Sequence, residues 1–169
     1  MISVDEYLTT AYRPDCDYVN GIVEERNVGQ KDHAKLQFRI PNWFWMRGKS
    51  LGLLALPDWR LRVAQDRYRV PDVCVVALPE PEGPVLVDPP YIVIEILSPD
   101  DTLGKLQERL DDYLAIGVEN IWVINPDNKR GWQASVQGLF ERHDGVFRTT
   151  DSRVAMPLAD LFSAEHFMA

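Results

Sequence analysis

The sequence has few cysteines and no long apolar run. Cys16 and Cys74 are the only two cysteines among 169 residues, so neither a disulfide framework nor a zinc-ligand spacing is present and a reducing compartment is expected. Cys74 lies in the apolar run 73–77 and is expected to be a small buried hydrophobe. No stretch approaches the roughly 20 apolar residues that span a bilayer, and Asp5 and Glu6 are atypical of a signal peptide. We therefore expect a cytoplasmic protein without membrane contact.

Positive charge is also scarce. The 18 Lys and Arg residues face 26 Asp and Glu residues, which gives a formal net charge of −8. An acidic chain repels nucleic acid at long range, which argues against tight non-specific DNA binding. A local basic patch or a bound cation overrides that field at close range, so a nuclease is not excluded.

Strand and helix patterns alternate along the chain and predict an α/β domain, with a mixed sheet flanked by helices, spanning 1–169. Its length and its 46% hydrophobic residues are typical of one domain. The continuous apolar run over 91–97 indicates a strand covered on both faces. The first half of the chain is expected to form a short helix ending before Pro14, a hairpin over 17–24, and a helix from about Lys31 that Pro41 kinks or splits. Paired strands over 59–63 and 68–76 follow, and then a strand over 91–97. The second half is expected to form a helix over about 103–116, a strand over 121–124, an outer strand pair over 132–136 and 147–150, and a terminal helix over 159–162.

Two carboxylates interrupt these apolar strands. Asp72 stands at the start of one strand and Glu95 in the middle of another, where an ionised carboxylate is costly unless it is paired. A divalent cation between them would relieve their repulsion, because Mg²⁺ commonly takes one or two carboxylates plus water. The alternative is that Asp72 caps a strand end while Glu95 pairs with an arginine such as Arg60, Arg62 or Arg69. The residues alone leave both interpretations open.

An ordered set of short motifs along the chain bears on the choice between these two interpretations. The motifs are Pro71-Asp72, then Glu95-Ile96-Leu97-Ser98-Pro99, then Tyr113 and Gly117-Val118, and then Ile121-Trp122-Val123-Ile124-Asn125-Pro126. Together they resemble the Uma-type family of restriction-endonuclease-like domains in the PD-(D/E)XK nuclease superfamily. The resemblance covers most of the chain, since 17–21 and His33 match the family's N-terminal pattern and 156–162 match its tail. We otherwise interpret His33 as an ordinary polar residue.

The resemblance implies a restriction-endonuclease-like fold and an Mg²⁺- or Mn²⁺-dependent hydrolysis of DNA. Asp72 and Glu95 would be metal ligands, with the backbone carbonyl of Ile96 as a third. Asp17 falls where the family often has a glutamate that completes the acidic cluster. The alternative for Asp17 is a solvated acid before a hairpin.

The superfamily's strand lysine is missing, because its position holds Leu97. In the Uma-type family the lysine lies instead on the following helix, where Arg109 matches it and Lys105 lies one turn earlier. Arg109 borders the apolar stripe of that helix and could reach the carboxylates. Arginine stays protonated, so it can orient water or stabilise phosphate charge but cannot act as a base. The alternative is a solvated helix face on which Lys105 and Arg109 pair with Asp101 or Asp112.

One dense basic patch and one apolar segment are further candidates for binding surfaces. Arg60 and Arg62 share one strand face, as do Arg67 and Arg69, and they either contact phosphates or pair with nearby acids. Apolar side chains over 43–46 suggest a homodimer. The leading hypothesis is a metal-dependent endonuclease acting on DNA. The alternative is a degenerate nuclease-fold module that binds nucleic acid or a protein partner without cleavage.

Overall fold

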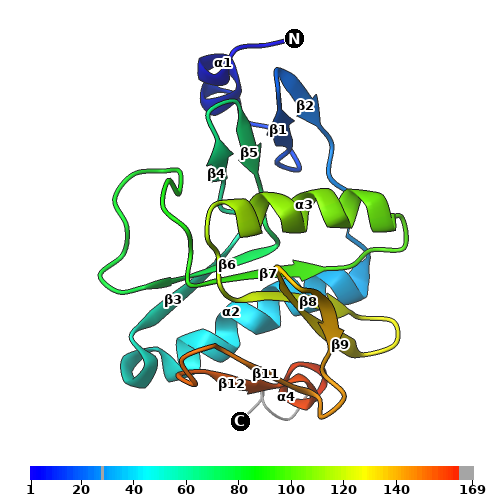
Figure 1. The fold of residues 1–169 in the computed structure, drawn as a ribbon. Helices are drawn as coiled ribbons and strands as arrows, with labels where there is room; N and C mark the ends of the chain where they lie inside the picture. Colours follow the sequence, from blue (N-terminus) through cyan, green and yellow to red (C-terminus); the bar gives the residue numbers. More distant parts are fainter. Residues whose placement is uncertain (28, 164–169) are drawn as a thin grey trace.

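The computed structural model describes residues 1–27 and 29–163. A six-stranded sheet forms its centre (Figure 1). Strands β7 and β8 are parallel and the other neighbours are antiparallel, so the predicted mixed sheet is confirmed. The strand order is β10 (Gly138–Glu141), β9 (Arg130–Ser135), β8 (Ile121–Asn125), β7 (Ile92–Ile96), β6 (Val73–Ala77) and β3 (Leu53–Pro57).

Two helices cover the two faces of this sheet (Figure 1). Helix α2 (Lys31–Leu51) places Leu36, Ile40 and Phe44 in one core cluster, and α3 (Leu103–Ala115) contributes to a second cluster. Pro41 lies inside α2, yet the helix continues through it, so the predicted split is wrong. Ile40 and Trp43, on either side of Pro41, are both buried in the core cluster, and this packing supports a continuous helix.

The side chains of β7 alternate between the two clusters. Its three isoleucines belong to the cluster under α2, and Val93 belongs to the cluster under α3. Glu95 therefore lies on the α3 face of the sheet. Cys74 of β6 belongs to the α3 cluster as well, which puts Asp72, two residues earlier, on the same side. All five residues of β7 are buried, as the apolar run predicts.

A second, smaller sheet lies beside α3 (Figure 1). Its order is β2 (Ile22–Glu24), β1 (Asp17–Val19), β5 (Arg67–Arg69) and β4 (Leu61–Ala64). The predicted hairpin over 17–24 is confirmed, and Asn20 and Gly21 both take positive φ at its turn. Helix α1 (Val4–Thr9) packs on this sheet through a cluster of three buried tyrosines, Tyr7, Tyr18 and Tyr68.

The predicted strand over 68–76 is wrong, because it is two strands in two sheets. Strand β5 ends at Arg69 in the small sheet and β6 begins at Val73 in the large one. Pro71 lies between them and has no N–H to donate to a ladder. The chain therefore crosses from one sheet to the other just before Asp72.

The predicted outer strand pair is also wrong. Strand β9 pairs with β10, whereas β11 (Val146–Arg148) pairs with β12 (Ala155–Pro157). The mostly exposed residues of β10 give little apolar alternation, so this strand has a weak sequence signal. The predicted terminal helix is confirmed as α4 (Leu158–Phe162).

Two further expectations concern exposed and buried apolar groups. Cys74 is buried as predicted, and both cysteines are free. In the segment proposed for dimerisation, Trp43 and Phe44 are buried while Trp45 and Met46 are exposed; a homodimer stays a prediction. None of the helices in the described ranges combines the length and apolar character needed to cross a bilayer.

Candidate functional site

One cavity of about 550 Å³ collects every site residue predicted from the sequence. Its lining has seven Asp and Glu side chains against four Lys and Arg side chains, and also includes His33. The lining is therefore acidic, and its field attracts cations. The predicted residues in this lining are Asp17, Asp72, Glu95, Ile96, Lys105 and Arg109.

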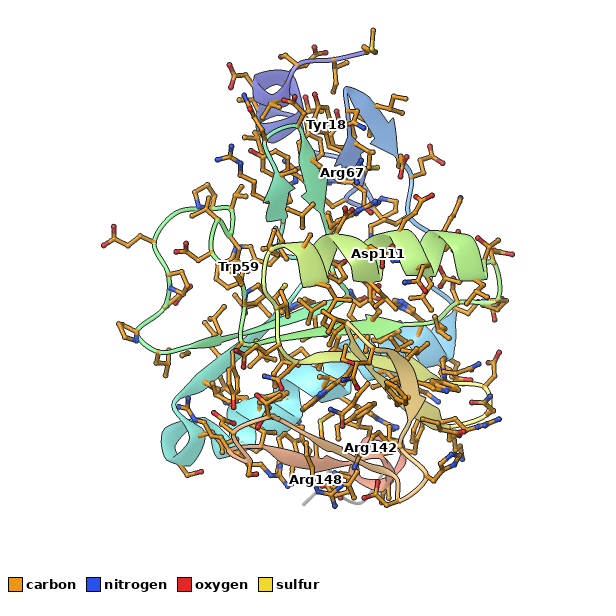
Figure 2. All side chains as sticks on the ribbon, in the orientation of Figure 1. Tyr18, Trp59, Arg67, Asp111, Arg142 and Arg148 are labelled. Carbon is orange, nitrogen blue, oxygen red and sulfur yellow. The ribbon has the colours of Figure 1, made fainter. Side chains whose placement is uncertain are left out.

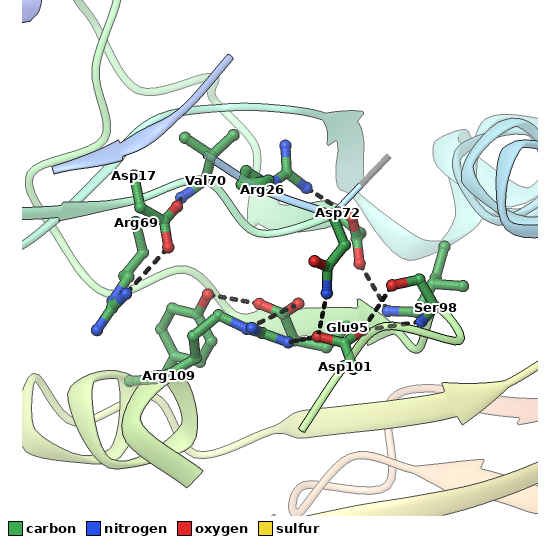
Figure 3. Close-up of polar contacts among 12 residues, drawn as sticks. Asp17, Arg26, Arg69, Val70, Asp72, Glu95, Ser98, Asp101 and Arg109 are labelled. Atoms are coloured by element: carbon green, nitrogen blue, oxygen red, sulfur yellow. Dashed lines mark hydrogen bonds and ion pairs between the residues drawn. The ribbon is translucent and has the colours of Figure 1, made fainter. Parts of the chain in front are cut away.

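Asp72 is buried and fully engaged (Figure 3). Its Oδ1 accepts from Nη2 of Arg26 at 2.6 Å and lies 3.2 Å from Nε2 of His33, and its Oδ2 accepts from the Ile96 N–H at 2.7 Å. Burial acts to raise the pKa of Asp72, but His33 and Arg26 outweigh it and hold that pKa below its usual value. Asp72 is therefore ionised at neutral pH, and the same contact raises the pKa of His33 against the opposing effect of its burial.

Glu95 is buried, and its neighbours offset the negative charge of its carboxylate only in part. The Tyr113 hydroxyl donates to its Oε1 at 2.5 Å, and Nε of Arg109 lies 3.5 Å from its Oε2. Burial raises the pKa of Glu95 to about 7, and the charge of Asp72 adds to the increase while Arg109 opposes it. Within the described part of the chain, Nε of Arg109 is buried without a hydrogen-bond partner. The arginine therefore does not fully offset the cost of ionising Glu95.

Arg109 reaches the carboxylates from α3, as its position beside the apolar stripe predicts. Its Nη2 donates to Asp101 at 3.1 Å, and Asp101 also accepts from the backbone N–H and the hydroxyl of Ser98 (Figure 3). Arg109 therefore bridges Glu95 and the turn that precedes α3. Lys105 lies on the same wall of the cavity and is exposed.

Asp17 lies in the lining of the acidic cavity, and a role in the acidic cluster stays a prediction. It is buried rather than solvated, which rules out the alternative of a solvated acid before a hairpin. Its carboxylate accepts from Nη1 of Arg69 at 3.0 Å and from the Val70 N–H at 2.8 Å (Figure 3). Both contacts tie β1 to the end of β5, so Asp17 holds the small sheet together at the edge of the cavity.

Three of the four arginines of the predicted basic patch, Arg60, Arg67 and Arg69, pair with acids. Nη1 of Arg67 and Nε of Arg69 both donate to Asp112, at 2.8 and 2.7 Å. Arg60 pairs with both oxygens of Asp15, at 2.8 and 2.7 Å. The pairing alternative therefore describes Arg60, Arg67 and Arg69, and Arg67 joins the small sheet to α3 (Figure 2).

The alternative for these two acids made Asp72 the cap of a strand end and paired Glu95 with an arginine, and the structure pairs both acids with arginines. Asp72 pairs with Arg26 and Glu95 with Arg109, rather than with Arg60, Arg62 or Arg69. Sequence reasoning missed Arg26, which lies in a polar stretch without a pattern. It also missed Tyr113, which sits in the apolar stripe of α3, where a buried hydroxyl that needs a partner was the available signal.

The chemistry of the two carboxylates suits a divalent cation. The described ranges hold no group of three or more His, Cys, Asp or Glu side chains placed for a metal. Mg²⁺ does not require one, since it commonly takes one or two carboxylates and keeps several waters. Asp72 and Glu95 share one sheet face and one acidic cavity, and each charge disfavours the other. A cation would relieve that repulsion.

Comparisons with known proteins identify the family and the fold of the chain. The chain is similar in structure to a crystal structure described as a "putative nuclease" from Anabaena variabilis ATCC 29413, with a TM-score of 0.79 and 24% sequence identity over 96% of this chain and 98% of the other. No curated protein matches the sequence. The Uma2 family, described as "Putative restriction endonuclease", matches residues 4–134. The chain therefore belongs to the Uma2 family and has a nuclease-like fold, a mixed sheet flanked by helices.

Proposed function

We propose that this protein is a metal-dependent endonuclease that hydrolyses phosphodiester bonds of DNA. Asp72, Glu95 and the carbonyl of Ile96 would hold Mg²⁺ or Mn²⁺. The observation that carries the proposal is the buried Glu95, whose pKa stays raised to about 7 although Arg109 lies beside it. A buried glutamate whose negative charge is only partly offset by its neighbours, next to an ionised Asp72, is characteristic of a site that binds a positively charged ligand.

The residues around the carboxylates would supply the rest of the site. The bound cation would polarise the phosphate and activate water. Arg109 and Lys105 would offset charge on the phosphate, and Arg109 would do so without exchanging a proton, because its pKa is raised by Glu95 and its other neighbours against the effect of burial. Tyr113 would orient Glu95, and Asp101 would hold Arg109 in place.

A second candidate function is binding without cleavage. It is favoured by the two ion pairs that already engage Asp72 and Glu95, and by Leu97 at the position of the strand lysine. In this case the cavity would hold nucleic acid or a protein partner and the carboxylates would keep their arginines. Mn²⁺ uptake separates the two candidates, because only the endonuclease needs the metal.

A cleavage assay tests the endonuclease. Wild-type protein is expected to nick supercoiled plasmid DNA with Mg²⁺ or Mn²⁺ and to be inactive in EDTA, and Asp72→Asn is expected to lose the activity. Asp111→Asn is a matched control, because Asp111 is exposed on α3 and bonds Gln107 at 2.8 Å outside the cavity (Figure 2). Equal cleavage by wild type and Asp72→Asn would rule the assignment out. Faster cleavage of RNA than of DNA would show that RNA, rather than DNA, is the substrate.

Tyr113→Phe is expected to weaken Mn²⁺ binding by about tenfold, because partners that orient metal ligands typically contribute 10- to 100-fold. The change removes one hydroxyl from a fully buried ring and the 2.5 Å hydrogen bond to Glu95. Calorimetric titration measures the affinity. Tyr91→Phe is the control, since the Tyr91 hydroxyl bonds Asp151 away from the cavity. Unchanged affinity in Tyr113→Phe would show that the hydroxyl serves only the core.

A further inference from the structure

Arg26 is a partly buried arginine whose guanidinium lies between two aspartates. Its Nη2 donates to Asp72 at 2.6 Å (Figure 3). Its Nη1 donates to Asp58 at 2.7 Å. Its side chain is only 19% exposed. Burial acts to lower its pKa, but Asp72 and Asp58 outweigh this and raise the pKa above the usual value. Arg26 therefore carries a fixed positive charge beside the cavity.

The two partners of Arg26 differ in their surroundings. Asp72 is buried in the cavity wall, whereas the side chain of Asp58 is 48% exposed. Asp58 directly follows β3 at a φ of +49°, and its Oδ1 also accepts from Nε2 of Gln37 at 2.9 Å. Asp58 is thus a second anchor for Arg26 outside the proposed metal position, and it would retain the guanidinium if Asp72 turned to another cation.

Arg26 also differs from the other arginine of the site. Arg109 approaches Glu95 at 3.5 Å without a hydrogen bond from Nε, whereas Arg26 makes a short charge-assisted hydrogen bond to Asp72. Such bonds are about twice as strong as neutral ones. Arg26 is therefore the stronger obstacle to a new cation at these carboxylates.

We infer that Arg26 is an internal counter-ion that competes with the divalent cation for Asp72 and so sets the metal affinity of the cavity. The inference rests on the proposed function. A guanidinium and a divalent cation on the same carboxylate repel each other, and binding of one must weaken binding of the other by the same factor. The acidic cavity therefore holds its metal more weakly than its carboxylates alone would allow.

Calorimetric titration with Mn²⁺ tests this with three variants. Arg26→Gln is expected to bind Mn²⁺ about tenfold more tightly than wild type, within the usual range of coupling between two ligands. Arg26→Lys keeps the charge and is expected to stay close to wild type. Arg148→Gln is the control, because Arg148 makes a 2.6 Å ion pair with Asp144 on the surface, at the opposite end of the molecule from the small sheet (Figure 2).

Thermal unfolding gives a second readout. Arg26→Gln is expected to unfold at a lower temperature than wild type without metal, because it leaves Asp72 with less compensation, and to gain more from Mn²⁺. Equal or weaker Mn²⁺ binding in Arg26→Gln than in wild type would overturn the inference and leave the proposed function standing. Absence of Mn²⁺ binding in wild type and in Arg26→Gln would overturn both.

NMR of the wild type does not depend on the folding of a variant. The guanidinium Nε–H signal of Arg26, assigned by its loss in Arg26→Lys, is expected to shift when diamagnetic Mg²⁺ is added. A control signal, that of Arg148, should stay in place. An unmoved Arg26 signal while Mg²⁺ binds would show that the two cations do not compete, and would overturn the inference.

Discussion

Replacing Glu95 with glutamine is expected to reduce metal-dependent DNA cleavage by roughly a thousandfold, because a metal ion contributes several kcal/mol to charge stabilisation. The amide keeps the size of the side chain and can still accept from the Tyr113 hydroxyl, which donates at 2.5 Å in the wild type. It removes the negative charge that the cation needs. Initial rates of plasmid nicking, measured across a range of Mn²⁺ concentrations, check this prediction.

The matched control for this loss is Glu108→Gln. Glu108 is an exposed residue of α3 that lines the same cavity but does not belong to the proposed ligand set. Glu108→Gln changes charge and size in the same way as Glu95→Gln, so a difference between the two variants reports the effect of position alone. A Glu95→Gln protein that cleaves as fast as Glu108→Gln would remove Glu95 from the metal site.

The same Glu95→Gln change is expected to stabilise the metal-free protein at alkaline pH by up to about 3 kcal/mol, the free energy that corresponds to a pKa raised from 4.5 to about 7. Above pH 7 the wild type must keep a buried ionised glutamate near Asp72. Glutamine does not ionise and avoids that cost. Urea unfolding in EDTA at pH 5 and at pH 8.5 measures the difference.

The pH dependence has a defined sign. Because the folded pKa of Glu95 lies above the unfolded value, its contribution to wild-type stability is fully present below pH 4.5 and is lost as the pH rises through about 7. The two proteins should therefore be nearly equal at pH 5 and should differ most above pH 7. A variant that is less stable than wild type at pH 8.5 would show that the Arg109 ion pair outweighs the burial of Glu95.

Local patterns were enough to predict most of the large sheet and its two helices. The apolar run that forms β7, the 3.6-residue stripe of α3 and the Asn20-Gly21 turn each depend on neighbours in the sequence, and all three are confirmed. The same patterns place Glu95 within a buried strand and Asp72 beside one. The position of both acids in one cavity follows from that arrangement.

The remaining features depend on contacts between distant segments. Whether 68–76 forms one strand or two depends on the chain passing from the small sheet to the large one, and Pro71 was the local signal for a break there. The partner of Asp72 is 46 residues away at Arg26, and the partner of Arg69 is 43 residues away at Asp112. Charged residues in polar stretches have many equivalent partners in a sequence, so these ion pairs could not be chosen without the fold.

The burial of Glu95 has a consequence for how such a chain changes over generations. On the stability prediction above, glutamine would fill the same space, keep a polar contact to Tyr113 and avoid the cost of a buried charge. Random substitution in a lineage that had abandoned the cavity would therefore tend to erase this acid early. Glutamate at position 95 is therefore expected in chains that retain the proposed metal site, and other residues are expected there in chains that have lost it.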